Sequence, residues 1–113
     1  DFKNYESDDL IEITKFLLLN DNRFKYTPET VDILMHYIDQ LKTFPAFANA
    51  RTLKVFVNQL LAFQAIRVEE TLMNTGSIDY DSLVTIKPED FKYFTGDDFI
   101  NIIGSEEVEL YKG

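Results

Sequence analysis

Apolar residues recur at helical spacing through the middle of the chain, after Arg51. They are Leu53, Phe56, Val57, Leu60, Leu61, Val68 and Leu72. This spacing places them on one face of a helix, which we predict from about Asn49 to Met73. Residues 74–76, with the sequence Asn-Thr-Gly, form a candidate C-cap, because glycine readily adopts the left-handed conformation that ends many helices.

A second helix is predicted to begin at Pro28. Thr27 is a suitable N-cap, proline is favoured at the first helical position, and Glu29 places an acid in the first turn. The apolar residues that follow form one stripe, made of Val31, Leu34, Met35, Ile38 and Leu41. We expect this helix to end near Thr43, before Pro45.

An earlier helix is predicted from Ser7 to about Leu19, after a linker at residues 1–6. Ser7 is a candidate N-cap, and the two aspartates behind it suit the positive end of the helix dipole. The residues assigned to its apolar face are Leu10, Ile13, Phe16 and Leu17. Residues 20–22, with the sequence Asn-Asp-Asn, are expected to end the helix.

The last third of the chain carries weaker patterns. Residues 77–86 include a strand-like run, Leu-Val-Thr-Ile, but four residues alone make a poor sheet. A short helix is predicted over residues 88–94. Residues 95–98 fit a capping box before another short helix at residues 99–103, and Gly104 with an acidic tail is expected to close the chain.

These elements predict an all-α fold, a small helical bundle of three principal helices with short C-terminal helices packed across them. The chain has 113 residues, of which 45% are hydrophobic and 14% aromatic, enough for one domain with a packed core. It starts at Asp1 rather than Met, and we interpret it as a domain of a longer protein.

The excess of acidic over basic residues argues against some classes of binding partner. The formal net charge is −9, which disfavours nucleic acid and anionic membrane surfaces. No apolar run approaches the length of a membrane span, and no signal-peptide pattern is present. The absence of cysteine excludes disulfides and thiolate sites and is compatible with the cytosol.

The titratable residues form no strong catalytic pattern. His36 is the only histidine and lies opposite the apolar stripe of its helix, so we interpret it as a surface residue; a catalytic dyad with a carboxylate is the alternative. Four acid pairs are adjacent in sequence, namely Asp8–Asp9, Glu69–Glu70, Asp97–Asp98 and Glu106–Glu107. Neighbours on a helix point apart, so we interpret the pairs as solvated faces and cap acids, with a metal or general-acid role as the alternative.

The glycines offer no phosphate-binding loop. Such a loop needs Gly-x-x-x-x-Gly-Lys-Ser/Thr, and none of Gly76, Gly96, Gly104 and Gly113 is followed by Lys-Ser or Lys-Thr. The chain alone is therefore not expected to hydrolyse nucleotide.

Arg51 is the residue that the helix pattern leaves without a structural purpose. It projects from the first turn of the long helix, away from the apolar stripe, where the helix dipole opposes a cation. Its position is unfavourable for stability, which leaves room for a functional role.

The sequence around Arg51 resembles a known lid. Residues 47–51, Phe-Ala-Asn-Ala-Arg, precede Val57-Asn58 and then Gln-Ala-Ile-Arg at residues 64–67. This order resembles the phrase that opens the long lid helix in a group of AAA+ ATPases, which contains the red-type Rubisco activases, the stage V sporulation protein K family and the type VII secretion ATPases. The resemblance includes Phe2, Tyr5, Leu10, Ile13 and residues 27–30 upstream, and it ends near residues 86–90.

The resemblance implies that Arg51 is the sensor-2 residue, which reaches from the lid to the phosphates of a nucleotide held by the preceding ATPase subdomain. A guanidinium suits this role, because it is always charged and its planar fork matches phosphate oxygens. Asn49 and Ala50 complete the predicted nucleotide-binding set, although Asn49 is preferred as the helix cap. The alternative is that Arg51 is an exposed arginine paired with an acid. Ala48 replaces the glycine usual in the family, and its Cβ is expected to tighten the turn.

Two further features are interpreted as structural. Arg67 falls within the apolar stripe of the long helix, so its charge needs a partner, which we expect to be an acid from the first or second helix; a nucleotide or subunit role is the alternative. The aromatic residues Phe44, Phe47, Phe56 and Phe63 are interpreted as core and inter-subunit packing rather than a ligand box.

The resemblance implies that residues 1–91 form the lid-like domain. Residues 92–113 lie beyond the resemblance; we expect them to form a helical, acidic extension packed on the lid, with a contact for a partner as the alternative. The resemblance also implies a lid that closes over ATP and Mg bound by the core of the intact parent protein, and that packs on neighbouring protomers of a cytoplasmic hexamer which remodels protein substrates. The isolated chain would then be no enzyme and would have no cofactor of its own. The alternative is a stand-alone acidic module that binds a basic protein partner with salt-sensitive affinity; a helical DNA-binding domain is disfavoured by the charge.

Overall fold

The computed structural model describes the backbone of residues 6–45 and 47–112 and the side chains as far as Gly104. The elements are α1 (Ser7–Phe16), η1 (Leu17–Asp21, a π-helix), β1 (Lys25–Tyr26), α2 (Pro28–Leu41), α3 (Ala50–Thr75), α4 (Tyr80–Leu83), β2 (Thr85–Ile86), η2 (Pro88–Tyr93, a 3-10 helix) and α5 (Gly96–Lys112). Helices dominate and the sheet is a single two-stranded pair, so the predicted all-α class is confirmed.

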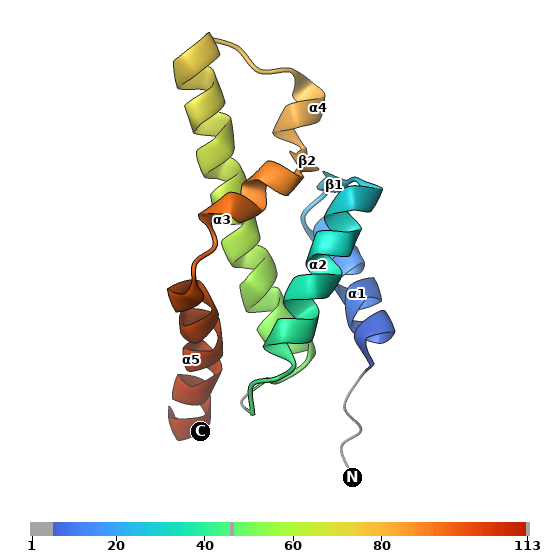
Figure 1. The fold of residues 1–113 in the computed structure, drawn as a ribbon, viewed down its shortest axis with the longest axis vertical. Helices are drawn as coiled ribbons and strands as arrows, with labels where there is room; N and C mark the ends of the chain where they lie inside the picture. The colour runs from blue at the N-terminus through green and yellow to red at the C-terminus, as the bar shows by residue number, and fades with distance from the viewer. Residues whose placement is uncertain (1–5, 46, 113) are drawn as a thin grey trace.

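The long helix α3 is the axis of the fold. Figure 1 shows it running most of the length of the molecule, with α1 and α2 on one side and α5 on the other. It has 26 residues and ends at Gly76, whose φ of 80° is the left-handed C-cap that the sequence predicted. Leu53, Phe56, Val57 and Leu60 are buried as predicted, whereas Leu72 near the far end is exposed.

The prediction for α2 is also confirmed. The hydroxyl of Thr27 accepts a hydrogen bond from the backbone N–H of Thr30 at 3.2 Å, so Thr27 caps the helix that begins at Pro28. Leu34, Ile38 and Leu41 from the predicted stripe are fully buried.

The prediction for α1 was wrong in its cap and in one residue of its face, Phe16, whereas Leu10 is buried and Ile13 and Leu17 pack half-buried against the core, as predicted. Glu6 occupies the N-cap position, and Ser7 lies inside the helix and donates its hydroxyl to Asp39 of α2 at 2.5 Å. The buried residues are Leu10, Ile11, Thr14 and Leu18, whereas Phe16 is 55% exposed. The π-helix η1 explains part of the shift, because its wider turn rotates the side chains after Phe16. Residues 1–5 of the predicted linker lie outside the described residues.

The strand-like run near residue 85 does pair, which the sequence did not predict. β1 and β2 form a parallel ladder in which Lys25 is opposite Thr85 and Tyr26 is opposite Ile86. The hydroxyl of Thr30 donates to the backbone oxygen of Ile86 at 3.1 Å and ties the ladder to α2. The partner strand lies about sixty residues earlier in the sequence, so a local pattern could not reveal the pairing.

The C-terminal helix is longer than predicted. Asp98 accepts hydrogen bonds from the backbone N–H of Thr95 at 2.7 Å and from its hydroxyl at 3.1 Å, as a capping residue should. α5 then continues through Gly104 to Lys112, so the predicted end of this short helix at residue 103 was wrong. A glycine inside a helix costs only about 1 kcal/mol, and it ends a helix only where it adopts the left-handed conformation.

An aromatic cluster joins α2, α3, η2 and α5. The ring of Tyr37 lies 5.0–5.9 Å from the rings of Phe56, Phe91, Phe94 and Phe99. Phe63 joins through Phe94 at 4.8 Å, and Phe44 and Phe47 pack half-buried against the core. The core role predicted for these phenylalanines is confirmed, and inter-subunit packing stays a prediction. In the part of the chain that is described, no helix is long and apolar enough to cross a membrane.

Candidate functional site

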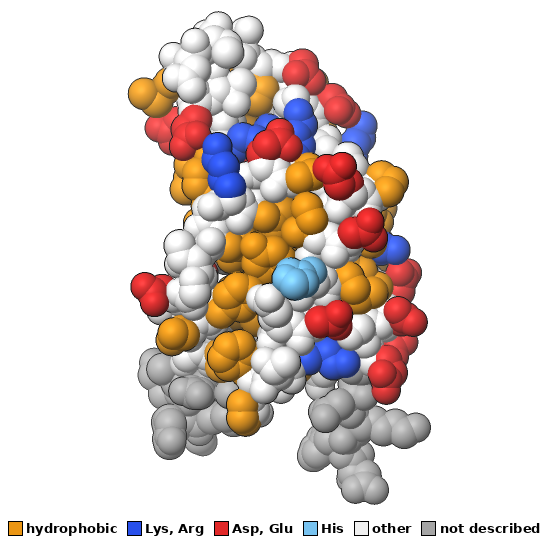
Figure 2. All heavy atoms as spheres, viewed as in Figure 1, with side chains coloured by type: hydrophobic (Ala, Val, Ile, Leu, Met, Phe, Trp, Pro, Cys, Tyr) orange, Lys and Arg blue, Asp and Glu red, His pale blue; other side chains and the backbone are white. Residues whose placement is uncertain are grey.

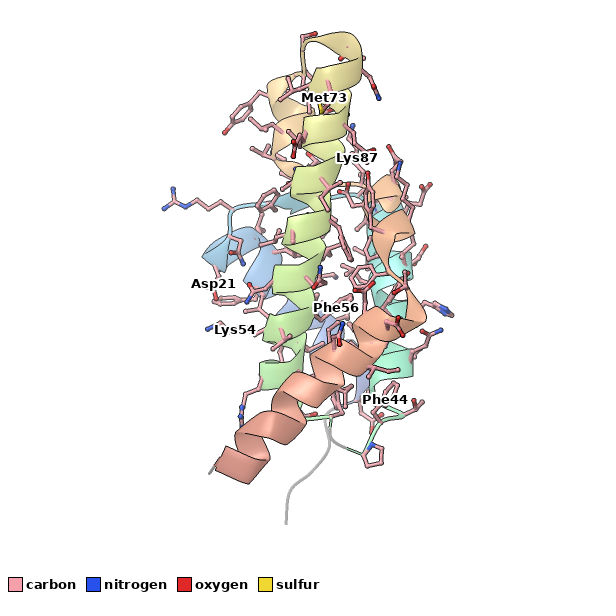
Figure 3. The ribbon with its side chains drawn as sticks, turned by 90° about the vertical axis from the view of Figure 1, so that its left-hand side faces the viewer. Asp21, Phe44, Lys54, Phe56, Met73 and Lys87 are labelled. Carbon is pink, nitrogen blue, oxygen red and sulfur yellow. The ribbon has the colours of Figure 1, made fainter. Side chains whose placement is uncertain are left out.

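The segment that joins α2 to α3 brings the predicted nucleotide-binding residues to the beginning of α3. It turns twice within a few residues, since Phe44 N–H donates to the oxygen of Leu41 at 3.2 Å and Phe47 N–H donates to that of Phe44 at 3.1 Å. Figure 3 shows Phe44 at the end of the molecule where α3 begins. Asn49, Ala50 and Arg51 therefore lie together at the N-terminal end of α3.

Asn49 occupies the N-cap position, but its side chain does not cap the helix. Its backbone has φ 49° and ψ −117°, in a region that glycine tolerates better than any other residue. The side-chain Oδ1 is buried without a hydrogen-bond partner among the described residues. Thr52, which is fully buried, accepts the backbone N–H of Ala48 at 2.8 Å instead. The predicted capping role of Asn49 is thus wrong.

Ala48 is compatible with this turn. The non-glycine residues with positive φ in the described chain are Arg23 and Asn49, so Ala48 adopts ordinary backbone angles that accept a Cβ. The backbone strain of the turn lies at Asn49, which has the positive φ.

Ala50 and Arg51 are both exposed. Arg51 lies on the side of α3 opposite the buried stripe, as the sequence predicted, and Lys54 is exposed about one turn further on. Figure 3 shows Lys54 pointing away from the body of the molecule and Phe56 pointing into it. This end of α3 therefore presents two cations and the positive end of a long helix dipole.

Arg67 is buried and has the acidic partner that the sequence required. Its guanidinium forms an ion pair with Asp90, and its Nη2 donates to the backbone oxygens of Ser82 at 3.0 Å and Thr85 at 2.9 Å. The acid comes from η2 rather than from the first or second helix, so that part of the prediction was wrong. Asp90 follows Lys87-Pro88, a helix-start signal that could have drawn attention to it as a cap acid.

A polar cavity of about 590 Å³ lies between the C-terminal half of α3 and the segment from Ser77 to Lys92. The charged residues that line it are Arg67, Lys87, Lys92, Glu70, Asp79 and Glu89. Several of these side chains form hydrogen bonds with neighbouring residues. Lys87 Nζ donates to Ser82 Oγ at 2.8 Å, Ser82 Oγ donates to Asp79 at 2.9 Å, and Tyr93 donates to Glu70 at 2.8 Å. Hydrogen bonds from the Ser82 backbone and hydroxyl lower the pKa of Asp79. The cavity is lined by equal numbers of cations and acids, and the hydrogen bonds among Asp79, Ser82 and Lys87 connect α4 to the beginning of η2.

The remaining candidates do not converge on a reactive centre. His36 is exposed, as predicted, and its ring bonds to Gln40 at 3.0 Å. The acid pairs at residues 8–9 and 69–70 and Asp97 are exposed, Asp98 is half-buried, and the side chains of the pair at residues 106–107 lie outside the described part. Within the described residues, no three or more His, Cys, Asp or Glu side chains gather where they could hold a metal ion.

The sequence profile of the AAA lid domain family matches residues 6–99. This chain belongs to the AAA lid domain family. The match covers α1 through the first turn of α5, so the family that the resemblance suggested is confirmed. The proposed boundary of the lid at residue 91 stays a prediction.

Individual relatives of this AAA lid domain agree with the family. It is 32% identical over 94 residues to a chloroplastic cbbX homolog from Guillardia theta. It is 28% identical over 93 residues to the chloroplastic ribulose bisphosphate carboxylase/oxygenase activase of Cyanidioschyzon merolae, and 30% identical over 92 residues to the CbbX protein of Cereibacter sphaeroides. These alignments cover 80–81% of the chain but only 25–30% of the relatives, so the AAA lid domain corresponds to one part of each relative.

Proposed function

We propose that this AAA lid domain closes over a nucleotide held by the ATPase core of its parent protein, and that Arg51 contacts the nucleotide phosphates from the beginning of α3. The observation that carries the proposal is the position of Arg51, which is exposed in the first turn of a 26-residue helix, on the face away from the core. A cation there is opposed by the helix dipole, so an anion that binds it gains from both the guanidinium and the helix end.

The neighbouring residues fit a close approach of the phosphates. Ala50 is exposed, and Ala48 carries only a methyl group, so neither blocks the helix end. Asn49 belongs to the same proposed set, and its Oδ1 is buried without a hydrogen-bond partner among the described residues, so its backbone rather than this oxygen would face a phosphate. These residues could contact a phosphate from one side, whereas the remaining contacts would have to come from the core.

ATP and Mg are thus assigned to the parent protein, with the core as their main binding partner. When bound, the ATP would supply the phosphoryl group that the core transfers to water. The part of this chain is to orient the phosphates through Arg51, which offers a planar pair of donors, and to shield them from bulk solvent. The chain by itself is proposed to have no catalytic activity.

The partners proposed for the lid are its own core and the neighbouring protomers of a hexamer. The relatives named as Rubisco activase and CbbX support a parent protein of the AAA+ class. We extend from them the proposal that the parent remodels a protein substrate in the cytoplasm, with no role for nucleic acid or membrane.

The test is Arg51→Ala in the intact parent protein, with Lys54→Ala as the control. Both positions are exposed cations near the beginning of α3, so the two variants remove the same charge from the same surface. We expect Arg51→Ala to lower ATP turnover by roughly tenfold or more, since an arginine–phosphate hydrogen bond contributes about 1.5–3 kcal/mol. Lys54→Ala should change turnover by less than about twofold, consistent with an exposed charge. Equal turnover in the two variants would remove the sensor role from Arg51.

A further inference from the structure

The polar cavity beside the C-terminal half of α3 contains a buried arginine that is only partly used. The Arg67 side chain is 9% exposed and lines this cavity of about 590 Å³. Its Nε and Nη2 form all the hydrogen bonds of the guanidinium, to Asp90, Ser82 and Thr85. Its Nη1 has no partner among the described residues. The one fully buried side-chain N or O atom without a partner there is Asn49 Oδ1, so solvent in the cavity reaches Arg67 Nη1.

Most other charged side chains of the cavity already have partners. Asp79 caps α4, because its carboxylate accepts the backbone N–H of Ser82 at 3.0 Å and the Ser82 hydroxyl at 2.9 Å. Lys87 Nζ donates to the same hydroxyl at 2.8 Å, and an ammonium group has three donors, so Lys87 keeps donors for a further partner. Glu70 and Lys92 lie 3.9 Å apart. Figure 3 shows Lys87 beside the C-terminal half of α3.

Glu89 is the acid that this network leaves out. It lines the cavity, is exposed, and forms no hydrogen bond or ion pair within the described residues. Asn74 and Thr75 line the same cavity at the C-terminal end of α3, where the helix dipole is negative. The cavity therefore offers unused donors at Arg67 and Lys87 together with unused negative charge at Glu89. Figure 2 shows cationic and acidic side chains interspersed across the upper part of this face, above its hydrophobic middle.

We infer that this cavity binds a small molecule that carries both a carboxylate and a protonated amine. The carboxylate accepts hydrogen bonds from Arg67 Nη1 and Lys87 Nζ, and the ammonium group faces Glu89 and the carbonyl end of α3. An ion of a single sign fits less well, because the lining residues carry equal numbers of cations and acids and some of them repel it. The volume lies within the range of about 300–1,000 Å³ that is typical of small-molecule sites.

The donor at Arg67 is in place before a ligand binds. The ion pair with Asp90 and two backbone hydrogen bonds hold the guanidinium, so binding requires no further ordering of this side chain. The inference goes beyond the nucleotide-dependent role of the lid. Arg51 lies about 24 Å away along α3, at about 1.5 Å per residue. The failure of either proposal therefore leaves the other standing.

The experiment titrates the 113-residue chain with glycine, β-alanine and γ-aminobutyrate, which separate the two charges by increasing distances. Binding is followed by NMR at the Nε–H of Arg67, which the ion pair with Asp90 shields from solvent. Each probe is added to about 10 mM, which detects dissociation constants in the millimolar range. We expect at least one amino acid to bind saturably and to shift this resonance.

Matched probes remove one charged group at a time. Methylamine, ethylamine and propylamine lack the carboxylate, and they should bind at least about tenfold more weakly than the corresponding amino acid, since hydrogen bonds to two cations are lost. Acetate, propionate and butyrate lack the amine, and they should bind about threefold more weakly, because Glu89 is exposed and its ion pair is weak.

Variants then assign the two ends of the ligand. Lys87→Gln should weaken binding of the amino acid about tenfold, and Glu89→Gln should abolish its advantage over the acid that lacks the amine. Lys54→Gln and Glu69→Gln are the matched controls, because they remove the same charges from exposed positions of α3 that do not line the cavity. Both controls should leave binding unchanged. A thermal melt of each variant establishes that it is folded.

Other results would overturn the inference. Saturable binding by none of the amino acids, or equal binding to Lys87→Gln and Lys54→Gln, would show that the cavity is not the site. Tighter binding of the acids that lack the amine would show that the cavity selects simple anions. Chemical-shift changes confined to the residues around Arg51 would place the probes at the other end of α3.

Discussion

Arg67 of α3 and Asp90 of η2 form an ion pair inside the lid, with side chains only 9% and 0% exposed. The second oxygen of Asp90 accepts the backbone N–H of Lys87 at 2.9 Å, and Arg67 Nη2 reaches two backbone oxygens of the α4–β2 segment. One charged pair thus joins the long helix to three later elements. It explains why a charge lies on the largely apolar buried face of α3, since Asp90 and the backbone oxygens of Ser82 and Thr85 accept its hydrogen bonds.

The first prediction concerns the removal of one partner of this pair. Asp90→Ala should lower the free energy of unfolding by about 3–5 kcal/mol, because it leaves the buried guanidinium of Arg67 without a counter-charge. Urea denaturation followed by circular dichroism would measure the change. The double variant Arg67→Met with Asp90→Leu should be more stable than Asp90→Ala alone, since it leaves no unpaired charge.

The control for this prediction is Lys92→Met. Lys92 lies 3.9 Å from Glu70, and both side chains are about half exposed, so the loss should be at most about 1 kcal/mol. If Asp90→Ala costs no more than Lys92→Met, the buried pair does not anchor the C-terminal segment.

The second prediction concerns the strained turn before α3. Asn49→Gly should raise the free energy of unfolding by about 1 kcal/mol, because glycine accepts φ 49° without strain and removes an unpaired buried oxygen. The greater freedom of glycine in the unfolded chain offsets part of this gain. A thermal melt of the variant would show a higher midpoint.

The same substitution at Asn58 is the control. Asn58 is exposed in the middle of α3, where glycine is a poorer helix former than asparagine by a few tenths of a kcal/mol. The two substitutions should therefore change stability in opposite directions. A lower melting midpoint for Asn49→Gly would mean that the turn does not strain Asn49.

The sequence was informative at several helix ends, where the signal is local. Thr27-Pro28 marks the beginning of α2 and Gly76 marks the end of α3, because caps depend on residues within one turn of the helix end. The β1–β2 pairing and the choice of Asp90 as the partner of Arg67 depend on contacts between distant residues. Along the first helix the π-helix explains only the change after Phe16, where Leu18 is fully buried and the predicted Leu17 is half-buried.

In the candidate site, too, some features follow from the local sequence and others depend on the folded structure. The sequence predicted the exposure of Arg51 on the outer side of α3, because the helical period fixes which side faces the core. It did not predict that the Asn49 side chain would leave the first turn of α3 uncapped, or that Thr52 would accept the Ala48 N–H. The apolar cavity lined by Phe44 and Ile100 was not predicted either, because it forms only where α5 lies beside the end of α2.

The third prediction concerns alkaline pH. Burial raises the pKa of Tyr37 above its ordinary value of 10.0. Above pH 10 the unfolded chain therefore loses this proton before the folded chain does, so stability is fully present below pH 10 and falls as pH rises through the folded pKa. Tyr37→Phe should flatten this fall in urea melts between about pH 9 and 12, the range that brackets an ordinary tyrosine. Tyr80→Phe, at a side chain that is 74% exposed, is the control, and an equal flattening there would contradict the assignment to Tyr37.

The last prediction concerns the buried hydroxyl that organises the beginning of α3. Thr52→Val keeps the shape of the side chain but removes the oxygen that accepts the Ala48 N–H at 2.8 Å. An unpaired buried donor costs about 1–3 kcal/mol, so the free energy of unfolding should fall by that amount. The control is Thr71→Val, whose hydroxyl donates to the backbone oxygen of Arg67 at 2.9 Å within the same helix and should cost less, because that bond is an addition to the helix ladder.

Hydrogen exchange distinguishes a local effect of Thr52→Val from a global one. If the hydroxyl holds the turn, exchange of the Ala48 amide should accelerate more than exchange of amides in the middle of α3, such as that of Leu60. Thr71→Val should leave the Ala48 amide unchanged, because its hydroxyl bonds near the other end of the helix. Equal acceleration at Ala48 and Leu60 would mean that Thr52 stabilises the whole lid without fixing the turn that presents Arg51.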